Sequence, residues 1–191
     1  MPRAQAVLPR PSRLVASDWV EAALAALAAG GIDAVRVEPL AKALDVTKGS
    51  FYWHFADRRA LLEAVLAHWS QGRRAAIRQQ ADLPGDPGAR LRHLAGLYTE
   101  RANPRGLAIE LAIRALARND VEAARAVRAV DLERLKIVSG LFAGLGWNAA
   151  QAQARAVLFY SYLFGESLLD PQTVSARTRN LAIEAMLQPH S

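Results

Sequence analysis

A run of hydrogen-bonding and aromatic side chains between Thr47 and Phe55 carries the clearest chemistry in this sequence. The hydroxyl of Thr47 is suited to a helix N-cap, so the run predicts a short helix from Lys48 to about His54. Phe51 and Phe55 lie four residues apart, which places both on one side of such a helix, facing a core. The opposite side presents groups that donate hydrogen bonds or carry charge, and these are Lys48, Ser50, Tyr52 and His54. A short helix of this kind fits the major groove of DNA, so we interpret the segment as a recognition helix.

The residues before this segment predict the other half of a helix-turn-helix. Residues 37–44 read as a short helix, because Pro39 suits a first turn and the apolar residues have helical spacing. Asp45 and Val46 then supply the tight turn between the two helices. Any pair of packed short helices explains the apolar positions equally well, so only the polar side of the second helix indicates DNA binding. Gly49 lowers helix propensity by about 1 kcal/mol, which is tolerable where another backbone comes close.

Residues 32–66, IDAVRVEPLAKALDVTKGSFYWHFADRRALLEAVL, resemble the TetR family of transcriptional regulators. The resemblance is centred on the segment from Lys48 to Phe55 and covers about the first third of the chain. It implies an all-α fold, in which a three-helix helix-turn-helix head is joined by a long helix to a C-terminal helical domain for ligand binding and dimerisation. Two residues depart from the family pattern. Asp45 stands where glycine is usual, and Glu38 stands where many relatives have a basic or neutral residue.

The chain is expected to have three parts. Residues 1–16 contain three prolines and three arginines without an acidic residue, and are expected to be a disordered arm that is either a solvated tail or a minor-groove contact. Residues 17–63 are expected to form the DNA-binding domain, with a first helix capped by Ser17 or Asp18. Residues 64–191 are expected to form the effector-binding and dimerisation domain. Helices are predicted over 18–29, 58–80, 89–102, 107–118, 121–143, 148–169 and 174–187.

Composition limits the classes of protein that fit. The chain has 191 residues, 52% of them hydrophobic, and no cysteine, which excludes disulfides and thiolate metal sites. No apolar run approaches the roughly 18 residues of a membrane span, so a soluble cytoplasmic protein without a membrane partner is expected. The net charge is +6, but residues 59–191 hold seventeen basic and twelve acidic residues. Most of the positive charge therefore lies outside the predicted DNA-binding domain, and the DNA prediction depends on the motif.

The motif assigns roles to individual side chains on double-stranded DNA. Base edges are expected to face Lys48, Ser50, Tyr52 and Trp53, beside Gly49. Phosphates are expected to be held by Thr47, Tyr52, His54 and Arg58. Asp57 is predicted to cap the long helix that follows, whose N-terminus is suited to a phosphate.

The middle helices carry apolar residues that either wall a pocket for an unknown small-molecule effector or simply form core. The candidates are Leu94, Tyr98, Ile109, Ile113 and Phe142. Glu110 lies within the same run, where its carboxylate would suit a cationic ligand. Arg114 follows four residues later, however, which favours an ordinary surface ion pair. The effector is expected to be apolar or amphipathic.

Residues 156–165, AVLFYSYLFG, are apolar or aromatic on nearly every side of a helix, which therefore needs cover on more than one face. A central helix in a monomeric bundle would satisfy this need. The family resemblance instead implies a homodimer formed through the last two long helices, with candidate interface residues Leu158, Phe159, Tyr162, Leu181 and Ala185. A dimer reads two DNA half-sites related by a two-fold axis.

Catalytic chemistry finds little support, because the four histidines are scattered and no phosphate-binding loop is present. No catalytic residue, metal ligand or cofactor is predicted. The sequence therefore predicts a DNA-binding transcriptional regulator, most simply a repressor that a small molecule releases from a palindromic operator. An effector-independent DNA-binding dimer and a transcriptional activator are the alternatives.

Overall fold

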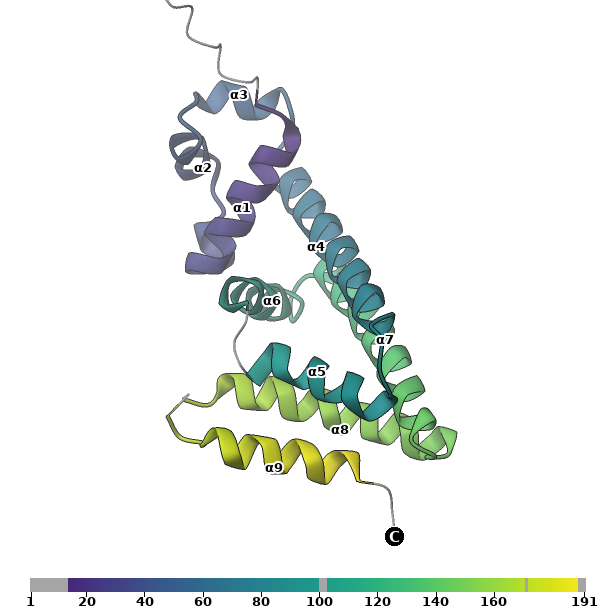
Figure 1. The fold of residues 1–191 in the computed structure, drawn as a ribbon. Coiled ribbons are helices and arrows are strands. Elements are labelled where there is room, and N and C mark those ends of the chain that lie inside the picture. The colour runs from purple at the N-terminus through teal and green to yellow at the C-terminus, as the bar shows by residue number, and fades with distance from the viewer. Residues whose placement is uncertain (1–13, 100–102, 171, 189–191) are drawn as a thin grey trace, which may run out of the picture.

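The computed structural model describes residues 14–99, 103–170 and 172–188, and within these ranges the regular structure is helical, without strands (Figure 1). The elements in chain order are α1 (Ala16–Gly30), the 3-10 helix η1 (Ile32–Ala34), α2 (Val37–Ala43), α3 (Lys48–Tyr52), α4 (Arg58–Ala81), α5 (Pro87–Thr99), α6 (Pro104–Leu116), α7 (Val121–Gly144), α8 (Ala149–Leu168) and α9 (Ala176–Leu187). The all-α prediction is confirmed. Nearly all of the predicted arm, residues 1–16, lies outside the described residues. No helix in the described ranges is long and apolar enough to cross a membrane.

Two helices begin where the sequence suggested a break. Asn103 and Pro104 were expected to end a helix, but the Asn103 side chain accepts a hydrogen bond from the Gly106 N–H at 2.7 Å, and Pro104 opens α6. Asp86 caps α5 in the same way, directly in front of Pro87. Proline disrupts a helix interior but suits a first turn, where its missing N–H leaves no bond unmade.

The start of α1 also differs from the prediction. The helix begins at Ala16, with Val15 at the N-cap position, instead of being capped by Ser17 or Asp18. Asp18 contributes from within the first turn, because its carboxylate accepts a hydrogen bond from the Val15 N–H at 2.7 Å. A carboxylate in the first turn stabilises a helix by the same means as a cap, by satisfying a free N–H.

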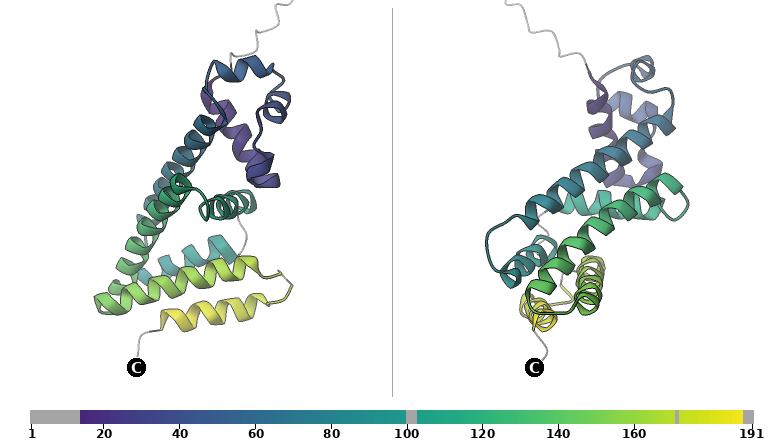
Figure 2. Two further views of the ribbon diagram at one scale, coloured as in Figure 1. Left: turned by 180° about the vertical axis from the view of Figure 1, so that it is seen from behind. Right: turned by 90° about the vertical axis from the view of Figure 1, so that its right-hand side faces the viewer.

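The helices form two groups at opposite ends of the molecule (Figures 1 and 2). Helices α1, α2 and α3 make up one end, which we call the head, and α5, α8 and α9 make up the other. Between them α4 and α7 pack along each other, and α6 crosses the space beside α1. The predicted domain boundary between residues 63 and 64 falls inside the continuous helix α4.

Two hydrophobic cores hold this arrangement. The first surrounds Trp19 and Phe51, both fully buried, whose ring centroids lie 5.3 Å apart edge to face. It joins the head to α4 and also takes in Ile109 and Ile113 of α6. The second core lies among α5, α8, α9 and the C-terminal half of α7. Helix α6 therefore contributes to the core of the head, although it comes much later in the chain.

Candidate functional site

The turn between α2 and α3 has the geometry that the sequence predicts. Asp45 has a φ of 53° and is the non-glycine residue with positive φ in the described part of the chain. Its N–H donates to the Lys42 carbonyl at 3.2 Å, and the Val46 N–H donates to the Ala41 carbonyl at 3.0 Å. Aspartate tolerates the left-handed conformation better than most residues do. The turn therefore forms with aspartate in place of glycine.

Helix α3 is shorter than predicted but is anchored as predicted. It ends at Tyr52, and Thr47 occupies the N-cap position without a side-chain cap hydrogen bond. Phe51 is fully buried and Phe55 nearly so, with their rings stacked at 5.6 Å between centroids. Two aromatic anchors on one side fix the direction in which the other side of α3 faces.

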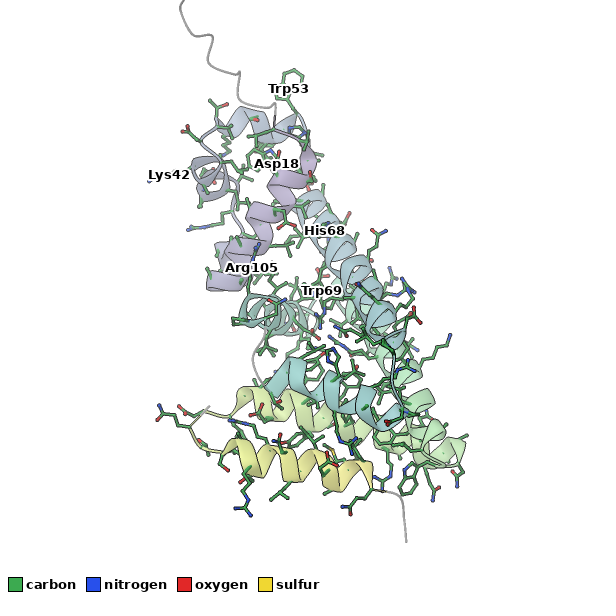
Figure 3. The ribbon with its side chains drawn as sticks, in the orientation of Figure 1. Asp18, Lys42, Trp53, His68, Trp69 and Arg105 are labelled. Atoms are coloured by element: carbon green, nitrogen blue, oxygen red, sulfur yellow. The ribbon has the colours of Figure 1, made fainter. Side chains whose placement is uncertain are left out.

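The outer surface of α3 presents large aromatic side chains to solvent. Trp53 is 85% exposed and Tyr52 is 55% exposed. Figure 3 shows Trp53 projecting from the tip of the head, away from the rest of the molecule. An exposed indole beside an exposed phenol is unusual for a surface without a partner, and such surfaces mark interaction sites. Gly49 is also open to solvent here, because a Cβ at this position would meet only the Thr47 hydroxyl, at 3.7 Å. Ser50 and His54 are half-buried at the edge of the same surface.

Lys48 already has a partner within the chain. Its Nζ lies 2.5 Å from a carboxylate oxygen of Glu38 on α2. This hydrogen bond raises the pKa of Lys48 and, chiefly through the same contact, lowers the pKa of Glu38. The departure from the family pattern at Glu38 therefore acts directly on the lysine predicted to read bases.

Arg58 has a structural role that the sequence did not indicate. Its Nε donates to the Val35 carbonyl at 2.6 Å, and its Nη2 donates to the Ile32 carbonyl at 2.8 Å. The guanidinium thereby joins the start of α4 to the loop around η1. Asp57 caps α4 as predicted, accepting a hydrogen bond from the Ala60 N–H at 2.8 Å. These carbonyls occupy two sides of the guanidinium, and the phosphate contact predicted for Arg58 stays a prediction.

A cavity of about 460 Å³ lies among α4, α5 and α6. Its wall combines a few polar groups with aliphatic side chains and includes Arg73, Gln80, Leu97, Tyr98, Leu107, Glu110 and Leu111. Of the residues predicted to bind a ligand, Tyr98 and Glu110 line this cavity. A cavity of this size that combines aliphatic side chains with polar groups is compatible with a small-molecule site. The described residues contain no cluster of acidic, histidine or cysteine side chains that would hold a metal ion.

The other predicted ligand residues belong to the two cores. Leu94 and Phe142 are buried in the second core. Ile109 and Ile113 are buried in the first core, on the side of α6 that contacts α1. Helical spacing identifies an apolar stripe on α6, but it does not say which neighbour that stripe faces. These four residues are therefore corrected from pocket wall to core.

Glu110 is not the surface ion pair that its spacing from Arg114 suggested, since only 1% of its side chain is exposed. Its Oε1 accepts a hydrogen bond from Arg134 Nη1 at 2.5 Å, and its Oε2 accepts one from Arg134 Nη2 at 2.7 Å. Arg114 does reach the same carboxylate, at 3.0 Å. Burial opposes ionisation, but the hydrogen bonds and charge of Arg134, together with the charges of Arg73 and Arg114, lower the pKa of Glu110. Sequence reasoning missed Arg134, which lies 24 residues away on α7.

Comparison with known proteins agrees with this geometry. Residues 20–65 match the family model of bacterial regulatory proteins, tetR family. This match spans the helix-turn-helix and the helices on either side of it, so this part of the chain is similar to the tetR family. Curated protein sequences give no match to the chain.

Solved structures extend the likeness to the whole TetR fold. A TetR-family transcriptional regulator from Agrobacterium tumefaciens is 18% identical, with a TM-score of 0.72 over 90% of this chain and 95% of that one. A transcriptional regulator from Saccharomonospora viridis in complex with choline is 13% identical, with a TM-score of 0.72 over 90% and 92%. FadR from Bacillus subtilis in complex with stearoyl-CoA is 13% identical, with a TM-score of 0.66 over 90% and 97%. At these identities the comparison shows the fold alone.

The last two long helices of this TetR fold carry an exposed apolar surface. Leu158 on α8 and Leu181 on α9 are 62% and 61% exposed, and Ala185 is exposed as well. Tyr162 is half-buried, and its hydroxyl donates to the Arg179 carbonyl at 3.4 Å. Phe159 is fully buried in the second core, 6.1 Å from Phe142 between ring centroids. Phe159 is therefore corrected from interface residue to core residue.

Proposed function

We propose that this chain is a homodimeric transcriptional repressor that a small molecule releases from a palindromic operator. The observation that carries the proposal is the surface of α3, where Tyr52 and Trp53 are exposed while Phe51 is locked in the core. This arrangement presents an aromatic surface, flanked by Lys48, of the size that a major groove admits.

Each polar group on this surface has a proposed part in binding. Lys48 would donate to guanine acceptors, and the rings of Tyr52 and Trp53 would contact thymine methyl groups, with Ser50 and Gly49 beside them. Phosphates would be held by Thr47, Tyr52 and His54. Arg58 would act on DNA mainly by holding the loop around η1 in place, through its bonds to the carbonyls of Ile32 and Val35.

Dimerisation is supported by the exposed apolar surface of α8 and α9, which includes Leu158 and Leu181. A single recognition helix reads only a few base pairs, whereas two copies related by a two-fold axis read two half-sites. The palindromic operator in this proposal follows from that symmetry.

The cavity among α4, α5 and α6 supports a response to a ligand, since a fully packed body would have favoured the effector-independent alternative. Helix α6 connects the two sites physically. Its residues Glu110 and Leu111 line the cavity, while Ile109 and Ile113 belong to the core of the head. A ligand that displaces α6 thus changes the packing against α1. Proteins of the same fold have been solved with choline and with stearoyl-CoA, which supports a small molecule as effector here.

The test is selection of bound sequences from a random DNA duplex pool at moderate salt, because phosphate binding alone is salt-dependent and carries no sequence information. Enrichment of a palindrome by the wild type, and not by a Trp53→Ala variant with unchanged circular dichroism, is expected. A reporter gene placed behind the selected operator should then be expressed less when the protein is present. Higher expression would favour the activator alternative. Failure of folded wild-type protein to enrich any sequence would contradict the proposal.

A further inference from the structure

Five charged side chains meet beside the cavity, where α4, α6 and α7 pack together. They are Arg73, Glu110, Arg114, Asp131 and Arg134. Three are cations and two are anions, so the cluster carries a net charge of +1 with every group ionised. Glu110 and Arg134 are buried and the other three are partly exposed, and a partly buried cluster with one unbalanced cation attracts an anion.

Glu110 has no remaining capacity for a cationic ligand. Its two oxygens accept from both terminal nitrogens of Arg134, and Arg114 and Arg73 approach the same oxygens at 3.0 and 3.2 Å. A carboxylate offers about four lone-pair positions, and these contacts use them all. The one buried carboxylate in the cavity wall is therefore already neutralised from within the chain.

The Nε of Arg134 is buried without a partner among the described residues, but Arg134 is not part of the wall of this cavity, and the cation with donor capacity at the cavity is Arg73. It lines the cavity, whereas Arg134 lies against the rings of Phe164 and Tyr160, at 5.3 and 5.7 Å from their centroids. The Nε of Arg73 is buried without a hydrogen-bond partner among the described residues, and its Nη2 lies a long 3.4 Å from the Tyr98 hydroxyl. A buried guanidinium donor without a partner is unfavourable, and a ligand oxygen would relieve it.

We propose that the cavity binds a small monocarboxylate, with its carboxylate on Arg73 and its apolar part against Leu97, Leu107 and Leu111. A single negative charge balances the net charge of the cluster, and the cavity of about 460 Å³ is in the range of small-molecule pockets. The assignment of this molecule as effector rests on the proposed function.

The same contact gives the ligand a way to act on the head. Arg73 on α4 now lies 3.2 Å from Glu110 on α6, and a ligand carboxylate competes for that guanidinium. Weakening this link between α4 and α6 frees α6 to shift, together with the Ile109 and Ile113 side chains that pack under α1.

The test uses probes that differ only in the head group. Octanoate and 4-phenylbutyrate are compared with their primary amides and with 4-phenylbutyltrimethylammonium, by calorimetric titration of the full chain. The acids should bind about tenfold or more tightly than the amides, as expected for a buried guanidinium–carboxylate pair. The preference should fall to about two-fold in Arg73→Gln and keep an intermediate value in Arg73→Lys, which retains the charge but not the forked geometry. Arg125→Gln is the matched control, because Arg125 is a surface residue that pairs with Glu122.

Acids that bind no better than their amides, preferential binding of the cation, or an acid preference that survives in folded Arg73→Gln would each overturn the inference. A parallel measurement of operator binding by fluorescence anisotropy separates this inference from the proposed function. Acid binding without operator release would contradict the proposed function and leave the carboxylate site standing. Operator release by an amide or the cation, but by no acid, would contradict the carboxylate site and support the proposed function.

Discussion

Lys48 of the recognition helix and Glu38 of the helix before it form an ion pair, 2.5 Å apart, on the surface predicted to face DNA. Both side chains are more than half exposed, at 51% and 65%, so the pair is accessible to a DNA duplex. A carboxylate at this position repels phosphates and holds the one lysine of α3. Reading of a base by Lys48 therefore has to break this pair.

Replacement of Glu38 by glutamine should strengthen operator binding and make it more salt-dependent. The variant frees the Lys48 cation and removes a negative charge, so the slope of log affinity against log salt should steepen by about one. Anisotropy titrations at several salt concentrations measure this slope. In a Lys48→Ala background the same substitution should give a much smaller gain. An equal gain with and without Lys48 would mean that the pair does not control the lysine.

Arg58→Ala should lower stability as well as DNA binding. Loss of the two bonds to the carbonyls of Val35 and Ile32 should cost about 1–2 kcal/mol of unfolding free energy, measured by urea denaturation. Arg58→Lys should recover little of it, because an ammonium does not reproduce the forked geometry. An Arg58→Ala protein with wild-type stability and weakened DNA binding would mean that Arg58 acts on DNA only as the predicted phosphate contact.

Gly49→Ala separates a folding role from a DNA-binding role. A Cβ at Gly49 meets nothing closer than the Thr47 hydroxyl at 3.7 Å, so alanine fits the free protein. Its higher helix propensity should leave stability unchanged or raise it by up to about 1 kcal/mol. Operator affinity should nevertheless fall, because the added methyl group occupies the surface that approaches DNA. Unchanged affinity would mean that DNA does not come close at Gly49.

The helix-turn-helix could be predicted from sequence because its determinants are local. The cap at Asp57, the turn at Asp45 and the buried pair Phe51 and Phe55 all depend on residues within a few positions of one another. Asp18 was predicted, with Ser17, as a candidate N-cap, but it lies inside the first turn and accepts a hydrogen bond from the Val15 N–H, because the helix starts two residues earlier than its polar residues suggest.

Residues whose partners are distant in sequence were assigned less well. Arg58 bonds to carbonyls more than twenty positions earlier, and Arg134 reaches Glu110 across 24 positions. An apolar stripe indicates that a residue is buried but not which neighbour covers it. For this reason Ile109 was wrongly predicted to line the pocket and Phe159 to lie in the dimer interface, whereas both are core residues. Only the tertiary packing of α6 and α8 distinguishes core, cavity and outer surface.

Glu110→Gln should destabilise the protein in a pH-dependent way. Burial opposes ionisation of Glu110, but its arginine partners prevail and its pKa in the folded protein is lower than the ordinary value of 4.5. The stabilisation is therefore complete above pH 4.5 and is lost as the pH falls toward the lower folded pKa. At pH 7 the variant should lose about 3–5 kcal/mol, since it leaves the buried Arg134 without the carboxylate that it binds through both terminal nitrogens.

Urea denaturation at pH 7 and at pH 3.5 measures this effect, and the difference between Glu110→Gln and the wild type should be smaller at the lower pH. The control is Glu184→Gln, which breaks an exposed pair with Arg92 and should have little effect at either pH. A constant difference across this range would show that the charge of Glu110 contributes nothing to folding.

The exposed leucines of α8 and α9 make the dimer testable by one substitution and one matched control. Leu158→Glu places a charge in the middle of the proposed interface, where two copies would bring two such charges together across the two-fold axis. Because Leu158 is 62% exposed in the isolated chain, the monomer should keep its fold and its melting temperature at low concentration. Light scattering should then show a monomer, and operator affinity should fall because the two heads no longer bind as one unit.

Val121, equally exposed at 62% but at the start of α7, provides the control, since Val121→Glu should leave both the dimer and operator binding intact. If Leu158→Glu remains a dimer of normal affinity, the copies must associate through another surface, and the apolar face of α8 and α9 would need a different partner.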